Sequence, residues 1–284
     1  MSALEQRPEV APRLPRPDLS PAVRITPVPF PGSRARHLVE RNVMNYRRHW
    51  MVIVSGFFEP FFYLLGMGFG LGAIVGPVAG PGGTLIPYAV FVAPALMASS
   101  AMNGAIYDST MNIYFKLRYS KIYDSILSTP LGAADVAIGE LTWALIRGTL
   151  YASSFLVIMA ILGLVQSPWA LLAIPGAMLI GFAFGAVGMA ATTYARSWAD
   201  FDLITLATMP LFLFSATFYP LDSYPEALRI IVQLTPLYHG VDLLRALTTG
   251  NLEPYLLVHV AYLVAMGILG LAISRRRFAR ILLR

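Results

Sequence analysis

Hydrophobic residues fall in long runs that charged residues interrupt at only a few places. No Asp, Glu, Lys or Arg occurs in residues 60–107, 148–195, 203–221 or 254–274. A membrane-spanning helix needs about 20 predominantly apolar residues, because each residue advances about 1.5 Å through a hydrocarbon core about 30 Å thick. The first two runs are long enough for two helices each, and the other two runs each suit one. The pattern therefore predicts an all-α integral membrane protein with six transmembrane helices.

We place the spans between the helix-breaking residues and the charged residues. Their approximate bounds are 50–71, 88–107, 141–165, 170–194, 203–218 and 254–274. Lys and Arg are enriched in cytoplasmic segments near spans, so their distribution indicates the orientation. With the N-terminus inside, Arg229 and Arg245 are the only Lys or Arg in the outer segments. We therefore expect a multi-pass protein of the cytoplasmic membrane, with both termini in the cytoplasm.

The segments at the two ends of the chain are more polar than the membrane domain at 50–276. Residues 1–32 are rich in Pro and Arg and predict a disordered cytoplasmic tail. Residues 33–49 place apolar side chains on one helical face and arginines on the others, which is typical of a helix in the membrane interface. A cytoplasmic extension of the first span is the alternative. Residues 277–284 predict a basic cytoplasmic C-terminus.

A polar segment separates the second and third predicted spans. Its apolar residues recur at helical spacing and form one stripe, which consists of Tyr119, Ile122, Tyr123, Ile126 and Leu127. The lysines and serines of the segment lie off this stripe. Thr129-Pro130 ends the helix, because a residue before proline disfavours helical backbone angles. We therefore expect a short cytoplasmic helix at about 116–128.

The segment between the fifth and sixth spans predicts a re-entrant helical hairpin at about 223–250. Ser223 is the expected N-cap of its first helix, and Thr235-Pro236 separates the two helices. Gly250 is the expected end of the second helix. Two short helices at membrane depth are tolerated only where protein or a water-filled cavity shields the broken backbone. The hairpin is therefore expected to pack on the outer side of the membrane domain.

Motifs for chemistry are scarce in this sequence. The chain has no cysteine, and neither of its lysines follows a glycine as a P-loop requires. Its four histidines lack the HExxH spacing of a zinc site. His239 and Asp242 lie at i and i+3, which we interpret as a local polar pair, with a membrane enzyme as the alternative. We expect no metal or cofactor bound by this chain and no nucleic-acid partner.

Two charged residues lie within predicted spans. Glu59 lies well inside the first span, where a carboxylate usually faces the interior of a helix bundle. We interpret Glu59 as a packing contact beside Pro60, and the alternative is a proton relay. Arg147 lies near the cytoplasmic end of the third span, so we expect its side chain to extend to the interface. The fourth span carries glycines that predict close helix packing: Gly181, Gly185 and Gly188.

Three stretches of the chain resemble a known transporter family. They are EPFFYLLGMGFGLG in the first span, YSKIYDSILSTPLGAADVAIGEL between the second and third spans, and FYPLDSYPEALRIIVQLTPLYHGVDLLR on the outer side. The sequence is similar to permease subunits of ABC-2 type (type V fold) exporters. The resemblance covers roughly residues 33–280 and points to the branch that contains nodulation-factor and daunorubicin-type export permeases.

The resemblance implies that the polar segment is a coupling helix. Such a helix docks on a separate ATP-binding subunit, which is present in two copies and binds ATP and Mg²⁺. A second permease chain, identical or homologous, completes the transporter. The docking residues that the resemblance implies are Lys116, Arg118, Tyr119, Lys121, Ile122, Tyr123, Asp124, Ile126 and Leu127. Some of the stripe residues are expected to pack on the permease's own cytoplasmic ends instead.

The resemblance also implies a path at the interface of two permease chains and a gate formed by the hairpin. Candidates for the path are Phe58, Glu59, Phe61 and Phe62, and candidates for the outer gate are Tyr219, Pro220, His239 and Asp242. The implied substrate is an amphipathic lipid, a drug or a (lipo-)oligosaccharide, since one scaffold can carry several substrate classes. The alternative functions are a proton-coupled secondary transporter that uses Glu59 and a polytopic membrane enzyme.

Overall fold

The structure is a computed structural model, and it describes the chain apart from residues 1–33, 48–57, 59–60 and 283–284. The described α-helices are α2 (Ala35–Arg47), α4 (Leu71–Val75), α5 (Tyr88–Tyr107), α6 (Ile122–Leu127), α7 (Ala133–Ile161), α8 (Ala173–Thr192), α9 (Asp200–Leu213), α10 (Glu226–Leu234), α11 (Pro236–Thr249) and α12 (Leu256–Leu282). Three π-helical segments are η1 (Leu64–Gly70), η3 (Asp108–Asn112) and η4 (Phe115–Tyr119). Short 3₁₀ turns are η2 (Pro81–Gly83), η5 (Pro168–Leu172) and η6 (Leu221–Ser223).

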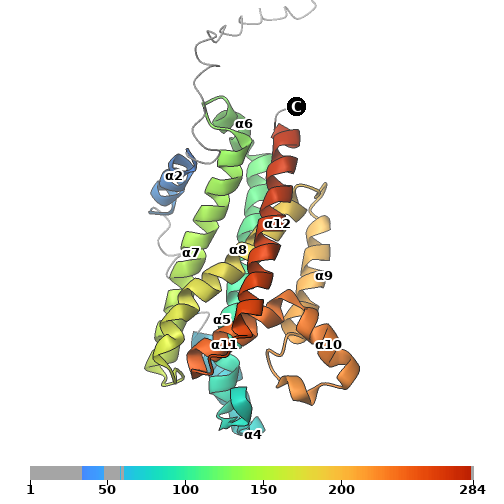
Figure 1. Ribbon diagram of the computed structural model, residues 1–284. Helices are drawn as coiled ribbons and strands as arrows, with labels where there is room; N and C mark the ends of the chain where they lie inside the picture. Colours follow the sequence, from blue (N-terminus) through green and yellow to red (C-terminus); the bar gives the residue numbers. More distant parts are fainter. Residues whose placement is uncertain (1–33, 48–57, 59–60, 283–284) are drawn as a thin grey trace, which may run out of the picture.

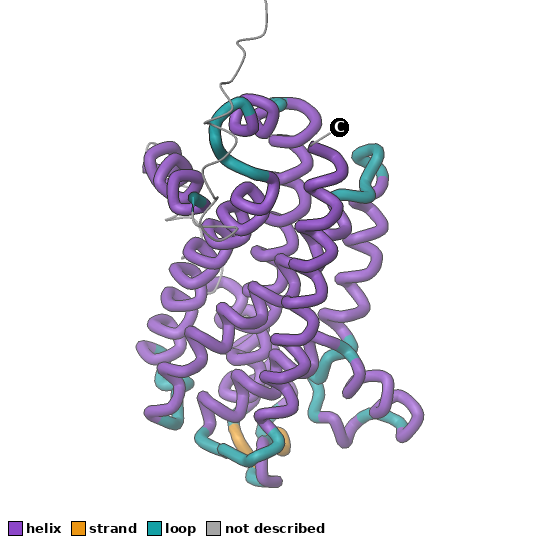
Figure 2. The backbone as a smooth tube through the Cα atoms, turned by 45° about the horizontal axis from the view of Figure 1, so that its top comes forward, coloured by secondary structure: helices purple, strands orange, loops and turns teal. Residues whose placement is uncertain are grey.

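The long helices run side by side between two ends of the molecule (Figures 1 and 2). One end, here called the α6 end, carries α2, α6 and the C-terminal part of α12. The other, here called the hairpin end, carries α4, α10 and α11. A two-stranded antiparallel ribbon, β1 (Val78–Ala79) and β2 (Leu85–Ile86), also lies there, with Val78 opposite Ile86. The two polar segments that the sequence singles out therefore occupy opposite ends.

Four described helical stretches are long and apolar enough to cross a membrane. They are Tyr88–Tyr119, Ala133–Ile161, Pro168–Thr192 and Leu256–Ile281. A shorter apolar helix, Phe61–Val75, overlaps the first predicted span, part of which is outside the described residues, and extends past the predicted end at residue 71. The 14-residue α9 lies in the fifth predicted span. A mostly helical membrane protein is therefore confirmed, while the number of six spans stays a prediction.

Helix α8 lies at the centre of the bundle and contacts α5, α7 and α12. Small residues allow this close approach. A side chain at Gly185 would place its Cβ 3.1 Å from Leu141 of α7. A side chain at Gly270 of α12 would place its Cβ 2.7 Å from the backbone nitrogen of Val187 in α8. The packing role that we predicted for the glycines of this span is confirmed.

Helix α2 packs against the α6 end of α7. Leu38 is 2% exposed, and the backbone of Gly139 in α7 lies directly beneath it. A Cβ atom at Gly139 would lie 2.9 Å from Leu38 Cβ and 3.1 Å from the carbonyl oxygen of Ala35, so a side chain there would push α2 away. Val43 and Met44 remain exposed on the same helix. One face of α2 is thus used for packing, and its position in the membrane interface stays a prediction.

Two helices, α10 and α11, form the segment in which we predicted a hairpin. They separate at Thr235, whose extended backbone precedes Pro236 at the start of α11. Helix α11 ends at Gly250, which adopts φ 88°, a left-handed conformation that glycine accommodates without strain. The predicted N-cap at Ser223 is wrong. Ser223 ends η6, and the N-cap position of α10 is Pro225.

Candidate functional site

The segment between α5 and α7 forms the tip of the α6 end (Figure 1). Part of its apolar stripe faces into the chain. Tyr123 is completely buried and Ile126 nearly so, and both belong to a hydrophobic cluster with residues of α2, α7 and α12. The Tyr123 ring meets Phe278 of α12 edge to face, with centroids 6.3 Å apart. These two stripe residues therefore anchor α6 to its own chain.

Other predicted docking residues face outward. Arg118, Tyr119 and Lys121 are exposed, whereas Ile122 and Leu127 are half-buried. The side chain of Asp124 lies outside the described residues. Lys121 has φ 45°, a left-handed conformation that is uncommon for a residue with a side chain, and it separates η4 from α6. The surface that the tip offers is therefore mainly polar and basic.

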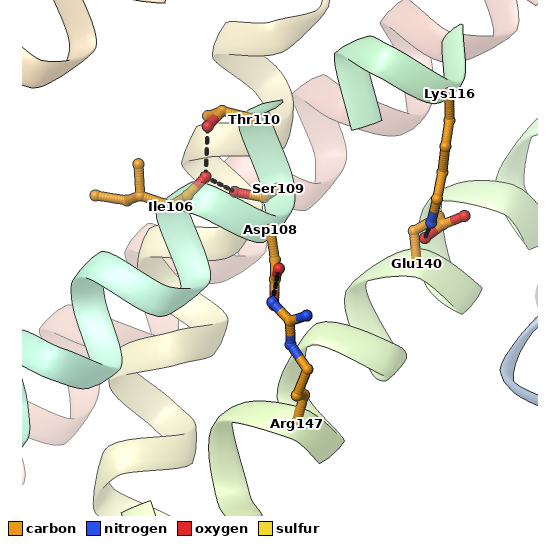
Figure 3. A network of polar contacts seen from close by, with 7 residues as sticks. All are labelled: Ile106, Asp108, Ser109, Thr110, Lys116, Glu140 and Arg147. Atoms are coloured by element: carbon orange, nitrogen blue, oxygen red, sulfur yellow. Dashed lines mark hydrogen bonds and ion pairs between the residues drawn. The ribbon is translucent and has the colours of Figure 1, made fainter. Parts of the chain in front are cut away.

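Two buried ion pairs connect the base of this segment to α7 (Figure 3). Lys116 Nζ lies 2.6 Å from Glu140 Oε2, and the side chains are 12% and 3% exposed. Further from the tip, Arg147 donates to Asp108, and both of these side chains are also buried. The prediction that Arg147 extends to the interface is wrong, because Asp108 offers its guanidinium a buried partner instead. Sequence reasoning identified neither pair.

Widened helical turns lie where the ion pairs form. The continuation of α5 contains η3, which begins at Asp108, and η4, which includes Lys116. Hydroxyl groups satisfy backbone oxygens at the first of these turns. Ser109 and Thr110 both donate to the carbonyl of Ile106 (Figure 3), and Thr192 of α8 donates to the carbonyl of Ser109. Because π turns are often found at functional sites, this stretch is a candidate for a functional role.

An aromatic cluster connects the same segment to α9. Tyr114 packs edge to face against Phe201 at a centroid distance of 4.9 Å and against Trp198 at 5.3 Å. The Trp198 indole nitrogen donates to the Tyr119 hydroxyl over 2.5 Å. Tyr114 also donates to the carbonyl oxygen of Arg196. The segment before α6 is therefore joined to α7 through ion pairs and to α9 through aromatic rings.

Glu140 also lies beside α6. Burial, followed by the neighbouring Glu140 carboxylate, raises the pKa of the Tyr123 hydroxyl well above its usual value. The hydroxyl is therefore protonated at neutral pH. Glu140 thus has two neighbours in this segment, which are Lys116 at its base and Tyr123 within α6.

A polar cavity of about 550 Å³ lies at the hairpin end. Its lining includes Tyr238, His239, Asp242, Arg245, Tyr255 and His259. An apolar cavity of about 730 Å³, lined by residues such as Leu71, Phe212 and Tyr219, lies next to it. The two cavities share Ala79, Pro220 and Asp222 in their walls. This end of the chain therefore offers a polar and an apolar compartment side by side.

His239 and Asp242 are brought together through a third residue. His239 Nδ1 lies 2.6 Å from His259 Nδ1, and His259 Nε2 lies 3.0 Å from Asp242 Oδ2. We predicted a local pair on one helix, whereas the contact runs through His259 of α12. His259 lies in a charge-free run, so only its polarity could have drawn attention to it. Among the described residues, no group of three or more His, Cys, Asp and Glu is arranged to hold a metal ion.

Arg245 of α11 is buried against α5. Its Nε donates to the carbonyl of Phe91 over 3.2 Å, and its Nη2 donates to the carbonyl of Ala216 over 2.8 Å. The guanidinium also lies 3.8 Å from the centroid of the Phe91 ring, a cation–π contact. Sequence reasoning treated Arg245 only as an outer charge. The structure shows that it fastens the second hairpin helix to the bundle.

The remaining predicted site residues lie apart from these two groups. Phe58, Phe61 and Phe62 are exposed, and Phe62 contacts the other two, with Phe58 and Phe62 stacked at 6.5 Å. Glu59 lies outside the described residues. Tyr219 is exposed and forms part of the apolar cavity with Pro220. The structure therefore brings the four outer gate candidates to the two adjoining cavities.

Most of the chain is similar to known transporter proteins. A family model described as ABC-2 type transporter matches residues 34–248. Nodulation protein J of Rhizobium leguminosarum bv. trifolii is 30% identical over 246 residues, which cover 84% of this chain and 92% of that protein. Nodulation protein J of Rhizobium meliloti (strain 1021) is 28% identical over 243 residues, covering 84% and 91%. The resemblance seen in the three sequence stretches is confirmed.

Proposed function

We propose that a separate ATP-binding subunit drives this chain through α6. The chain belongs to the ABC-2 type transporter family and is a permease subunit of an ABC exporter. The family implies association with an ATP-binding subunit. In the proposed complex, two ATP-binding subunits bind ATP and Mg²⁺, and two permease chains, identical or homologous, form the path. The α6 end then faces the cytoplasm together with both termini.

The observation that carries this proposal is that the segment at 116–128 has one side buried in its own chain and another side exposed. Tyr123 and Ile126 fix the helix to α7 and α12, while Arg118 and Lys121 lie exposed beside it. A docking element needs both properties, because it must present groups to a partner and must also transmit force to the helices behind it. We therefore assign docking to Arg118, Tyr119, Lys121 and the outer edges of Ile122 and Leu127.

Charge reversal at the tip tests the docking assignment. Arg118→Glu combined with Lys121→Glu should reduce the amount of ATP-binding subunit that co-purifies with the permease at least tenfold, because both exposed cations change sign. Arg36→Glu, an exposed cation of α2 at the same end, is the matched control and should retain the subunit. Normal retention in the double variant would contradict docking at this surface.

The two adjoining cavities at the hairpin end favour an amphipathic substrate. One compartment is lined by ionisable and aromatic side chains, and the other by apolar side chains that include Tyr219 and Pro220. We propose that they receive the polar and the apolar part of the substrate as it leaves, with His239 and Asp242 on the polar side. Phe58, Phe61 and Phe62 are proposed to line the path from the first span, whereas Glu59 among them is assigned to helix packing.

Alkyl glycosides of increasing chain length test the substrate class. In the reconstituted complex, stimulation of ATP hydrolysis should grow with chain length and should be absent with the sugar alone. Equal stimulation by the sugar would contradict an amphipathic substrate.

Glu59→Gln should leave ATP-driven transport mostly intact, because we assign Glu59 a packing role; complete loss would instead favour a proton relay.

A further inference from the structure

The two buried ion pairs form successive contacts between the same two helices, α7 and the continuation of α5. Glu140 and Arg147 are seven residues apart on α7, which is about two turns, so both side chains point to one face. Their partners Lys116 and Asp108 follow in the opposite chain direction. These two antiparallel helices are therefore connected at two positions along their length (Figure 3).

The π turns bring the two partners on the α5 side closer to one direction. Asp108 and Lys116 are eight residues apart, and in an α-helix their directions would differ by about 80° around the axis. The π turns η3 and η4 contain more residues per turn, which reduces this difference. The widened turns thus bring a carboxylate and an ammonium group to the face that meets α7.

Charged pairs are an unusual choice for stability alone. A buried ion pair is seldom more stabilising than a well-packed apolar pair, but removing one partner leaves the other charge buried and uncompensated. Such a pair therefore resists separation strongly while adding little to overall stability. Its distinctive effect is to hold two particular residues opposite each other.

The position of the pairs in the chain connects them to α6. Lys116 precedes α6 and Glu140 follows it, so the inner end of the whole segment is closed by their contact. Tyr123 within α6 lies beside Glu140. A displacement of α6 therefore acts on the Lys116–Glu140 contact, which joins the continuation of α5 to α7.

We propose that Lys116–Glu140 and Asp108–Arg147 join α5 and α7 into one unit, so that displacement of α6 by an ATP-binding subunit moves both helices together. The inference rests on the proposed function, because that subunit supplies the displacement. All four side chains are positioning residues. They act by keeping the distance between α5 and α7 constant during the ATP cycle.

Pulsed electron paramagnetic resonance tests this constancy in the complete complex. The chain contains no cysteine, so spin labels at the exposed positions Asn103→Cys in α5 and Ile161→Cys in α7 report one distance. The complex is placed in phosphatidylethanolamine–phosphatidylglycerol nanodiscs, with labelled chains diluted by unlabelled ones. The distance should be the same with and without a non-hydrolysable ATP analogue. A nucleotide-dependent change in this otherwise unaltered chain would overturn the proposal.

Variants of the first pair complete the test. Glu140→Gln should make the distance nucleotide-dependent, and Lys116→Glu combined with Glu140→Lys should restore the constant value. Glu40→Gln, in an exposed contact with His37 at the same end, is the matched control and should behave like the unaltered chain. If Glu140→Gln does not assemble, Lys116→Gln replaces it. Constancy in the single variant would overturn the inference, whereas absence of a bound ATP-binding subunit would instead contradict the proposed function.

Discussion

The two ends of the molecule treat buried charge in different ways. At the α6 end, Lys116 and Arg147 each face a carboxylate of a neighbouring helix. At the hairpin end, Arg245 is held by two backbone carbonyls and an aromatic ring. A paired charge fixes two side chains against each other, whereas a carbonyl-bound charge anchors its helix to the backbone of its neighbours. The α6 end is therefore held together by paired side chains, and the hairpin end by backbone contacts beside two cavities.

Breaking the deeper ion pair is expected to have the largest effect. Arg147→Met leaves the Asp108 carboxylate buried without its guanidinium partner, which should lower the free energy of unfolding by about 3–5 kcal/mol. Equilibrium unfolding in mixed detergent micelles measures the loss. Adding Asp108→Asn should recover part of it. A loss below about 1 kcal/mol is typical of a solvent-exposed pair and would contradict its burial.

Removing the carbonyl-bound arginine should cost less. Arg245→Met leaves the carbonyls of Phe91 and Ala216 without this donor, which should lower the free energy of unfolding by about 1–3 kcal/mol. The same unfolding measurement compares it directly with Arg147→Met. If the Arg245 variant proved the more damaging of the two, the proposed contrast between the ends would be reversed.

The smallest effect is expected at the aromatic contact with α9. Tyr119→Phe removes only the acceptor of the exposed Trp198 hydrogen bond, so the free energy of unfolding should fall by about 0.5–1.5 kcal/mol. Tyr119→Ala should cost more, because the ring contact at 5.7 Å with Trp198 is lost as well. Equal losses in the two variants would show that the ring contributes nothing.

Much of the helical arrangement could be predicted from the sequence, because a hydrocarbon environment excludes charged residues from spans. The charge-free runs contain most of α5, α8 and α12. The apolar stripe of α6 was visible too, but its period reports only that one face avoids water. That Tyr123 packs on Phe278 of its own chain depends on where α12 ends, which no local pattern contains.

The polar contacts escaped prediction for geometric reasons. Asp108 and Lys116 would point about 80° apart on an ordinary α-helix. The π turns that reduce this angle have no clear sequence signature. His259 lies in an apolar run far along the chain from Asp242, so only tertiary packing brings them within 3.0 Å. Arg147 was noticed, but its partner could be found only once α5 and α7 were placed side by side.

Site-specific photo-crosslinking tests most directly whether α6 receives the ATP-binding subunit. A photoreactive amino acid replaces Ser125, which is exposed on α6, or Leu228, which is exposed on α10 at the hairpin end. In native membranes, the Ser125 position should capture a polypeptide that mass spectrometry identifies by its P-loop sequence, and the Leu228 position should not. Capture from Leu228 instead of Ser125 would contradict the account.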